Sequence, residues 1–136
     1  MTNLEIIRQF QYALWDEKNL NVIDKFFDRE ALIHSPVAST QGTERMKEII
    51  RQWYTGFPDL KVFWDDFICE EDKVVSRWHA EGVHQGDFSG YPPSNHTIHY
   101  SGVTIYQLRH GKIRQYWAFV DMQTIWKQLT GSTITG

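Results

Sequence analysis

The chain has little cysteine and no long apolar run, and each absence excludes a class of protein. Cys69 is the single cysteine among the 136 residues, so no intramolecular disulfide can form. No His or Cys lies near it in a zinc or nucleophile pattern, and we expect it to be a small buried residue. No apolar run approaches the roughly 18 residues that a membrane helix needs, and the N-terminus lacks the regions of a signal peptide. The sequence therefore predicts a cytoplasmic protein without a membrane partner.

The chain also lacks a cluster of basic residues. Its formal net charge is −3, and no basic run is longer than a residue or two, so nothing in the sequence would attract a phosphate backbone. Nucleic acid is therefore excluded as an expected partner. What the chain does contain is aromatic residues, which make up 15% of it and include six tryptophans. Rings in this number fill a core or line a cavity, and the length fits a single domain over residues 1–136.

Helical patterns occupy the N-terminal part of the sequence. Thr2 and Glu5 form a capping box ahead of a helix that we expect to reach residue 18. A short helix is predicted over residues 20–27, and a loop that carries His34 follows it. Apolar residues recur at helical spacing over residues 46–54, which predicts the clearest amphipathic helix of the chain.

The pattern changes to alternation after residue 60. Strands are predicted over residues 60–69, 73–81, 97–108 and 112–121, with short turns that fit antiparallel hairpins. A Gly/Pro/Ser-rich loop spans residues 86–95, a last helix is expected over residues 122–129, and a frayed tail over residues 131–136. This order of elements predicts an α+β fold, in which helices pack on one face of a curved antiparallel sheet and the curl of the sheet leaves a pocket.

Asp121 at the end of the last predicted strand has two interpretations. It shares a strand face with Trp117 and Phe119, where an apolar environment would raise the pKa of its carboxyl and suit it to general acid/base chemistry. Alternatively, Asp121 caps the N-terminus of the helix that follows it. A single Asp before an amphipathic stretch does not decide between the two.

An ordered set of short motifs runs along nearly the whole chain. Its segments are His34-Ser35-Pro36, Gly42, residues 56–60, 74–78, 82–88 and 90–93, Gly111-Lys112-Ile113, Trp117, Asp121 and Gln128-Leu129. Each motif is weak alone, but the ordered set is fairly specific. It resembles the SnoaL-like polyketide cyclase (ester cyclase) family of the NTF2-like superfamily.

The resemblance implies both a fold and a chemistry. The fold is a cone of three N-terminal helices closing over a strongly bent antiparallel sheet around a hydrophobic pocket, usually dimeric through the sheet. In such cyclases an aspartate near the end of the last strand abstracts a proton, and the enolate closes a ring by intramolecular aldol attack without a metal or organic cofactor. Asp121 matches that aspartate. Two positions depart from the family pattern, because Gln115 stands where an acid is common and Val83 where a Thr is usual.

Further side chains are candidates for the site. His84, at the Gly-x-His-x-Gly position of the family, is the second catalytic candidate, or else it bonds the backbone at a strand bend. Arg77, in mid-strand, either pairs with an acid such as Asp66 or holds an anionic substrate. The other candidates for substrate binding are aromatic or donor side chains, namely His34, Tyr12, Trp53, Trp117, Phe119 and Phe88.

No metal site is expected. The pairs His79/His84 and His96/His99 place their members on opposite strand faces, and no carboxylate completes a triad. The long loop over residues 86–95 has two interpretations: its glycines permit Phe88 and Tyr91 to close over the pocket as a lid, or it is a plain strand connection.

Three functions therefore remain open at this stage. The first is a cofactor-independent enzyme in which Asp121 acts as general acid/base on a hydrophobic carbonyl compound. The second is a non-catalytic protein that binds a small hydrophobic molecule, and the third is an epoxide hydrolase-like activity on the same fold. We also expect a homodimer on the outer sheet face, because strand residues expected there would leave an apolar patch, namely Trp64 or Trp78, Tyr106 and Tyr116.

Overall fold

The computed structural model describes residues 1–130, so the predicted tail over residues 131–136 lies outside the described residues. Its helices are α1 (Asn3–Gln11), the π-helix η1 (Tyr12–Asp16), α2 (Val22–Phe26), α3 (Thr43–Gly56) and α4 (Met122–Leu129). Its strands are β1 (Phe27–His34), β2 (Ser39–Gln41), β3 (Lys61–Glu70), β4 (Lys73–Val83), β5 (Thr97–Arg109) and β6 (Lys112–Val120). No helix among the described residues is long and apolar enough to cross a membrane.

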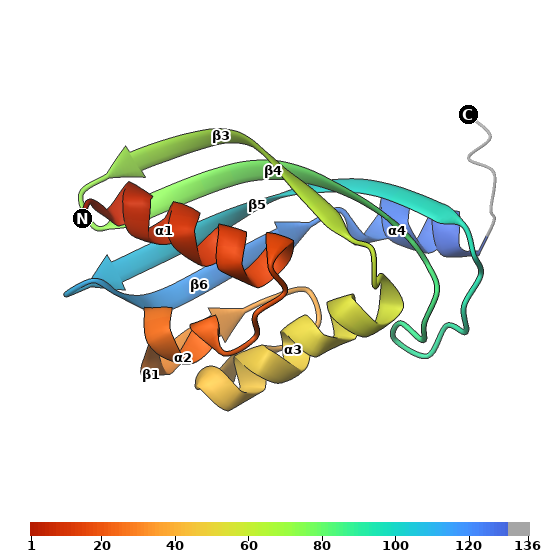
Figure 1. The fold of residues 1–136 in the computed structure, drawn as a ribbon, viewed down its shortest axis with the longest axis horizontal. Helices are drawn as coiled ribbons and strands as arrows, with labels where there is room; N and C mark the ends of the chain where they lie inside the picture. Colours follow the sequence, from red (N-terminus) through yellow and green to blue (C-terminus); the bar gives the residue numbers. More distant parts are fainter. Residues whose placement is uncertain (131–136) are drawn as a thin grey trace.

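The strands form one sheet in the order β2-β1-β6-β5-β4-β3. Figure 1 shows that the long strands β3 to β6 curve together, with α1 and α3 on the same side of the sheet. Helix α1 packs against β3 and β4, and α3 packs against β1 and β2. The predicted α+β cone of helices over a curved sheet is confirmed. Helix α4 adds a further helix at the end of β5, which it contacts.

The segment between α2 and α3 was predicted as a loop, and this prediction is wrong. It forms β1 and the three-residue strand β2, and β1 runs parallel to β6 with Ile33 beside Tyr116. The sheet is therefore mixed, whereas the sequence predicted an antiparallel sheet. The signal is weak because charged residues follow the buried Phe27 at the start of β1. Only Ala31 and Ile33 are buried beyond them, too few positions to define alternation.

The first helix begins as the capping box predicts, because the Thr2 hydroxyl accepts a hydrogen bond from the Glu5 N–H at 3.1 Å. After Gln11 the helix widens into the π-helix η1 and ends close to the predicted limit at residue 18. Leu14, on η1, is buried and Trp15 is half-buried. Single π-turns of this kind are uncommon and occur often at functional sites.

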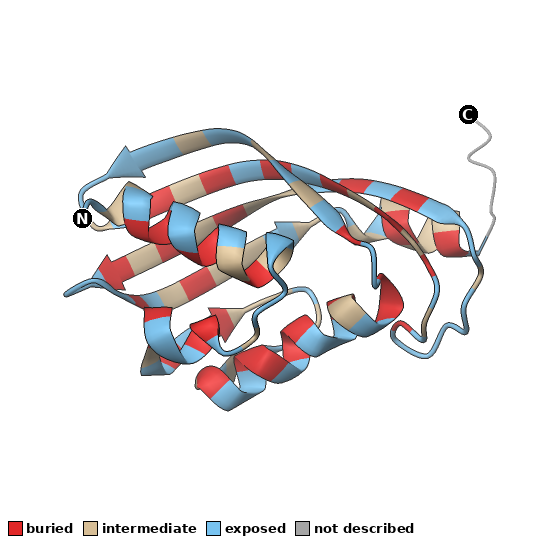
Figure 2. Ribbon diagram, viewed as in Figure 1, coloured by how far each residue is buried: buried red, intermediate tan, exposed pale blue. Residues whose placement is uncertain are grey.

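The hydrophobic core lies between the helices and the inner face of the sheet (Figure 2). Along β4 and β5 every second residue is buried, so side chains such as Trp78 and Tyr106 face the helices. The sequence placed Trp64 or Trp78, Tyr106 and Tyr116 on the outer face, and this is wrong: Trp78, Tyr106 and Tyr116 are buried, and Trp64 is half-buried. Alternation identifies the two faces of a strand but not which of them is covered.

The outer face of the sheet still carries apolar side chains, but different ones. Phe63, Ile68 and Phe119 are exposed there, together with Leu32 of β1. Cys69 is also exposed, so the expectation that it is buried is wrong. These residues were not distinguishable from core residues by pattern alone.

Candidate functional site

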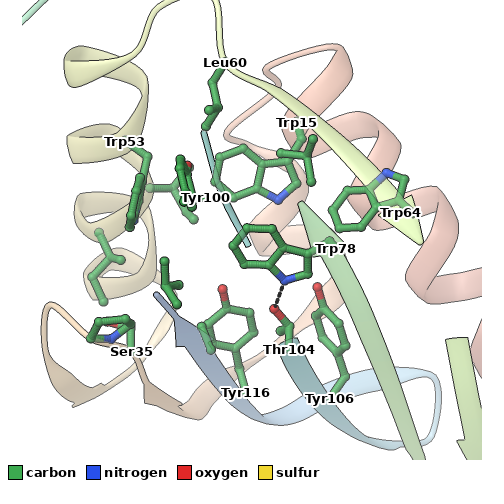
Figure 3. Close-up of a pocket in the computed structure, with 16 residues that line it drawn as sticks. Trp15, Ser35, Trp53, Leu60, Trp64, Trp78, Tyr100, Thr104, Tyr106 and Tyr116 are labelled. Atoms are coloured by element: carbon green, nitrogen blue, oxygen red, sulfur yellow. Dashed lines mark hydrogen bonds between the residues drawn. The ribbon is translucent and has the colours of Figure 1, made fainter. Parts of the chain in front are cut away.

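A cavity lies between α3 and the inner face of the sheet, and its walls are rich in indole rings. Four tryptophans line it: Trp15 from η1, Trp53 from α3, Trp64 from β3 and Trp78 from β4. Figure 3 shows these rings arranged around a common space. Ile49, Leu60 and Val62 complete much of the remaining apolar wall. Such a lining favours a flat hydrophobic molecule.

The polar groups of the cavity come mainly from β5 and β6. Tyr100, Thr104 and Tyr106 lie on β5, and Tyr116 lies on β6 directly opposite Tyr106. The rings of Tyr106 and Tyr116 meet edge to face, with centroids 5.6 Å apart. Among the described residues that line the cavity there is no Asp, Glu, His, Lys or Arg. Hydrogen bonds from neutral donors are therefore the polar contacts that this cavity offers.

Some of these polar groups are held by protein partners. The Trp78 indole N–H donates to the Thr104 hydroxyl at 3.0 Å, as drawn in Figure 3. The Gln11 amide donates to the Tyr106 hydroxyl at 3.3 Å, while the Gln11 carbonyl oxygen is buried without a hydrogen-bond partner among the described residues. The strand register thus fixes a row of hydroxyl groups beneath the aromatic walls.

Burial keeps these tyrosines neutral. Desolvation raises the pKa of Tyr100, Tyr106 and Tyr116 far above the ordinary tyrosine value, and the hydrogen bonds of Gln11 and Thr104 oppose this only partly for the pKa of Tyr106. The tyrosine side chains of the cavity are therefore O–H donors throughout the physiological pH range, and none is a base.

The cavity is small in this conformation. Its enclosed volume is about 40 Å³. This value is well below the roughly 150 Å³ of an engineered cavity that binds benzene. A ring must therefore displace a wall side chain to enter, and two of the wall tryptophans, Trp15 and Trp64, are only half-buried.

A second hollow, which we call the outer hollow, lies on the other side of one cavity wall. Its own residues include His34, Trp117 and Phe119, and its volume is about 350 Å³. The two spaces share Ser35, Pro36, Ala118 and Val120. The last residue pair between β1 and β6 is His34 and Trp117. Strand β6 therefore extends three residues, 118–120, beyond the end of β1. On the β1 side, these three residues of β6 have no strand partner within residues 1–130, and Ala118 and Val120 among them line both spaces.

The structure places Asp121 outside the cavity, as the N-cap of α4. Its carboxylate accepts hydrogen bonds from the Thr124 N–H at 3.1 Å and from the Thr124 hydroxyl at 2.6 Å. These hydrogen bonds lower the pKa of Asp121, and the side chain is exposed. The expectation of a buried carboxyl with a raised pKa is therefore wrong, because the strand face that Asp121 shares with Phe119 is the outer one.

Arg77 and Tyr12 also lie away from the cavity. Arg77 is exposed on the outer face of β4, opposite Val103, so it does not carry the cost of a buried charge. Its cross-strand neighbour on β3 is Asp66, but no ion pair joins them among the described residues. Tyr12 is exposed on η1. Neither side chain is brought to the cavity that Trp53 lines.

His84 is fully buried but belongs to the base of the long loop. Its Nδ1 accepts a hydrogen bond from the Ser94 N–H at 3.2 Å and lies 2.9 Å from the Ser94 hydroxyl. Because Nδ1 is the acceptor, the neutral ring carries its proton on Nε2, which has no hydrogen-bond partner among the described residues. The ring packs against Phe57, and His84 does not line the cavity.

The remaining candidates divide into two groups. Trp53 lines the cavity, as expected, whereas Phe88 lies behind it, fully buried against the rings of Trp53 and Phe57. His34 and Trp117 stack on each other with centroids 5.6 Å apart and line the outer hollow together with Phe119. Of the substrate-binding residues predicted from the sequence, the cavity itself contains only Trp53.

The sequence analysis missed many of the cavity residues, among them Trp15, Trp64, Trp78, Tyr100, Thr104, Tyr106 and Tyr116. A usable signal existed, since Tyr100, Thr104 and Tyr106 share one face of a regular strand. No group of three His, Cys, Asp or Glu side chains close enough to hold a metal occurs within residues 1–130.

Comparisons with known proteins identify the family of the chain and its fold. A family model described as SnoaL-like polyketide cyclase matches residues 5–129. TsrD from Streptomyces laurentii is 26% identical, covers 93% of this chain and 94% of its own, and superposes with a TM-score of 0.83. No curated protein matches the sequence.

Two further solved structures show the same fold. A candidate SnoaL-like polyketide cyclase from Jannaschia sp. CCS1 is 22% identical, with coverage of 96% of this chain and 93% of its own and a TM-score of 0.86. IdmH from Streptomyces antibioticus, a candidate polyketide cyclase, is 22% identical, with coverage of 96% and 99% and a TM-score of 0.81.

Proposed function

Since the chain belongs to the SnoaL-like polyketide cyclase family, we propose that it binds a small hydrophobic carbonyl compound in the aromatic cavity and promotes enolate chemistry of the ring-closing kind. The observation that carries the proposal is the cavity itself, whose walls are aromatic and whose polar groups are neutral hydroxyl donors. Donors of this kind stabilise the negative charge that develops on a carbonyl oxygen when the adjacent carbon loses a proton. The chemistry needs no cofactor, and the ligand's apolar body matches the walls.

Enolate chemistry also needs a proton acceptor, and Asp121 is our candidate. It follows Val120, which lines both the cavity and the outer hollow at the unpaired edge of β6. In the present conformation the carboxylate is held by Thr124, so it must leave that partner to reach a ligand. The proposal therefore includes a local rearrangement at the start of α4.

A second candidate function is binding without chemistry. It is favoured by the absence of any carboxylate or imidazole among the described residues that line the cavity. The epoxide hydrolase alternative receives no such support, because Arg77 lies on the outer face of the sheet.

One experiment tests the proposal and separates these two functions. With 1-phenyl-2-propanone as probe in D₂O, we expect proton NMR to show contacts between the ketone and the cavity rings and a faster exchange of its α-protons than in buffer. Asp121→Asn should keep the contacts and lose the acceleration, on the order of 100-fold or more, because the amide does not accept the proton. Asp87→Asn, which changes an exposed acid elsewhere, is the matched control. Contacts without acceleration in the wild type would support binding alone, and contacts outside the cavity would refute both.

The same position has a structural role that can be measured separately. Asn is as good an N-cap as Asp, so Asp121→Asn should preserve the melting temperature at neutral pH. Asp121→Ala should lower the free energy of unfolding by about 1 kcal/mol. Because the folded-state pKa of Asp121 is lowered, its ionised form stabilises the fold above the unfolded pKa of about 3.9, and this contribution is lost as the pH falls through the lower folded value. The stability of the wild type relative to Asp121→Asn should therefore fall below about pH 4, because the amide does not titrate.

We also propose a homodimer through the outer sheet face, with residues other than those expected from the sequence. Val75, Ile105 and Trp117 are direct cross-strand neighbours on that face, and the exposed Phe119 lies beside them opposite Val103. A continuous apolar patch of this kind on a sheet favours self-association.

Sedimentation should therefore show a species of twice the 16.1 kDa chain mass at micromolar concentration. Phe119→Asp should convert it to the monomer, since it places a charge in the patch, while Tyr12→Asp on the helical side should not. A monomeric wild type at that concentration would rule the dimer out.

A further inference from the structure

Two tyrosines of the cavity have hydroxyl groups without a protein partner. Tyr100 and Tyr116 are 6% and 8% exposed, and neither hydroxyl is hydrogen-bonded to another group within residues 1–130. Both hydroxyl oxygens keep some exposure within the cavity, so their O–H groups are open to a ligand there.

The other buried tyrosine hydroxyls are paired. The Tyr106 oxygen accepts a hydrogen bond from Gln11, and the Tyr54 hydroxyl donates to the Leu14 carbonyl. What distinguishes Tyr100 and Tyr116 is that both line the cavity and are free of such partners. Figure 3 shows the Tyr116 hydroxyl directed toward the space enclosed by the tryptophans. The unpaired donors are therefore where a ligand would lie.

The cavity also restricts the charge of that ligand. None of its described lining residues is a Lys, Arg or His, so a carboxylate placed there would lose its hydration without meeting a cation. A neutral oxygen is different, because it accepts hydrogen bonds from phenols at no such cost. Tyrosines that burial keeps protonated can donate their O–H to such an oxygen.

We propose that Tyr116 and Tyr100 select the ligand by donating hydrogen bonds to the carbonyl oxygen of a neutral, ring-bearing ketone, so that hydroxyl groups rather than charges determine specificity. This inference rests on the proposed function and adds the chemical class of the ligand. In a proton abstraction at the carbon next to a carbonyl, the electron pair of the C–H bond moves onto the carbonyl oxygen and the proton goes to the base. A phenol that already donates to that oxygen stabilises the enolate formed.

Three matched probes test the selection, each with a benzene ring and a side chain of similar size: 1-phenyl-2-propanone, propylbenzene and phenylacetate. For the wild type, we expect the ketone to bind roughly two- to tenfold more tightly than propylbenzene, the range for one neutral hydrogen bond. Phenylacetate should bind more weakly than either. In the double variant Tyr100→Phe/Tyr116→Phe, the affinities for ketone and propylbenzene should become equal while that for propylbenzene stays unchanged.

Each outcome decides between the proposals. Equal affinity of the wild type for ketone and propylbenzene, or tighter binding of phenylacetate, overturns the inference and leaves the proposed function standing. If neither ketone nor propylbenzene binds in the cavity, the proposed function fails and the inference fails with it. A ketone preference that survives in the double variant overturns the inference as well, because other groups then supply the contact.

Stability measurements exclude a merely structural role. Tyr100→Phe and Tyr116→Phe remove unpaired hydroxyls, so their melting temperatures should equal or exceed that of the wild type. Tyr106→Phe leaves the Gln11 amide without its acceptor and should lower the melting temperature. If Tyr116→Phe lowers it as much as Tyr106→Phe does, the Tyr116 hydroxyl has a structural partner and is not available to a ligand.

Discussion

Replacing Phe88 with alanine is expected to lower the free energy of unfolding by about 3–5 kcal/mol, the range for a buried phenylalanine. The side chain is fully buried and contacts the rings of Trp53, Phe57 and Trp126, and it lies against Gly56 at the end of α3. Its removal leaves a space that these rings cannot fill without leaving their own contacts. Thermal unfolding should show a melting temperature lower by roughly 10 °C or more.

Tyr91→Ala is the matched control in the same loop. Tyr91 stacks on Trp126 but is 38% exposed, so we expect a loss of about 1 kcal/mol. A large loss for Phe88 and a small one for Tyr91 would show that the loop is anchored in the core by one ring. The contrary result, a stable Phe88→Ala variant with weakened ligand binding, would restore the interpretation of Phe88 as part of a lid.

Gly86→Ala is expected to produce the second large loss of stability. A Cβ at this position would lie 2.0 Å from the Thr55 carbonyl oxygen, far inside van der Waals contact with the backbone of α3. The N–H groups of Gln85 and Gly86 both donate to the Gly56 carbonyl, at 3.0 and 3.3 Å, and the added methyl group would force these bonds apart. We expect a loss of about 2–3 kcal/mol in a denaturant titration, with an unchanged m-value.

Gly90→Ala tests the other explanation, in which this loop needs glycines for their backbone conformational freedom. Gly90 has a φ of +86°, but a Cβ there would meet nothing within 4 Å. The free energy of unfolding of the variant should therefore fall only by the roughly 1–2 kcal/mol that the left-handed conformation costs a residue with a Cβ. If Gly90→Ala were the more damaging of the two, backbone conformation rather than close approach would govern the loop.

These glycines illustrate what the sequence could and could not predict. Composition identified residues 86–95 as a loop, and its glycines suggested hinge motion. Gly86 instead allows the loop to touch the carbonyl end of α3, a contact between residues about 30 positions apart. A short-range pattern contains no information on which distant backbone a glycine approaches.

The helices and the four long strands were predictable because their periodicity is strong and local. β1 was not, since its pairing with β6 joins residues more than 80 positions apart and its own alternation is short. The cavity residues could not be predicted for a related reason. Trp78, Tyr106 and Tyr116 were recognised as strand residues, but which face of the sheet the helices cover follows only from the assembled sheet. Asp121 was recognised by its place in the chain, and its capping role was one of the two interpretations.

The two edges of the sheet also determine how this protein avoids uncontrolled aggregation. An open edge is a template on which foreign strands add, and β2 limits that risk by its length of three residues. β3, the other edge, has ten residues, but a bulge between Trp64 and Asp66 interrupts its ladder and places Asp65 against His79 at 2.8 Å. An incoming strand would meet a bend with two carboxylates. Edge-to-edge polymerisation is thereby disfavoured, so that two copies that meet can associate only through the outer face of the sheet.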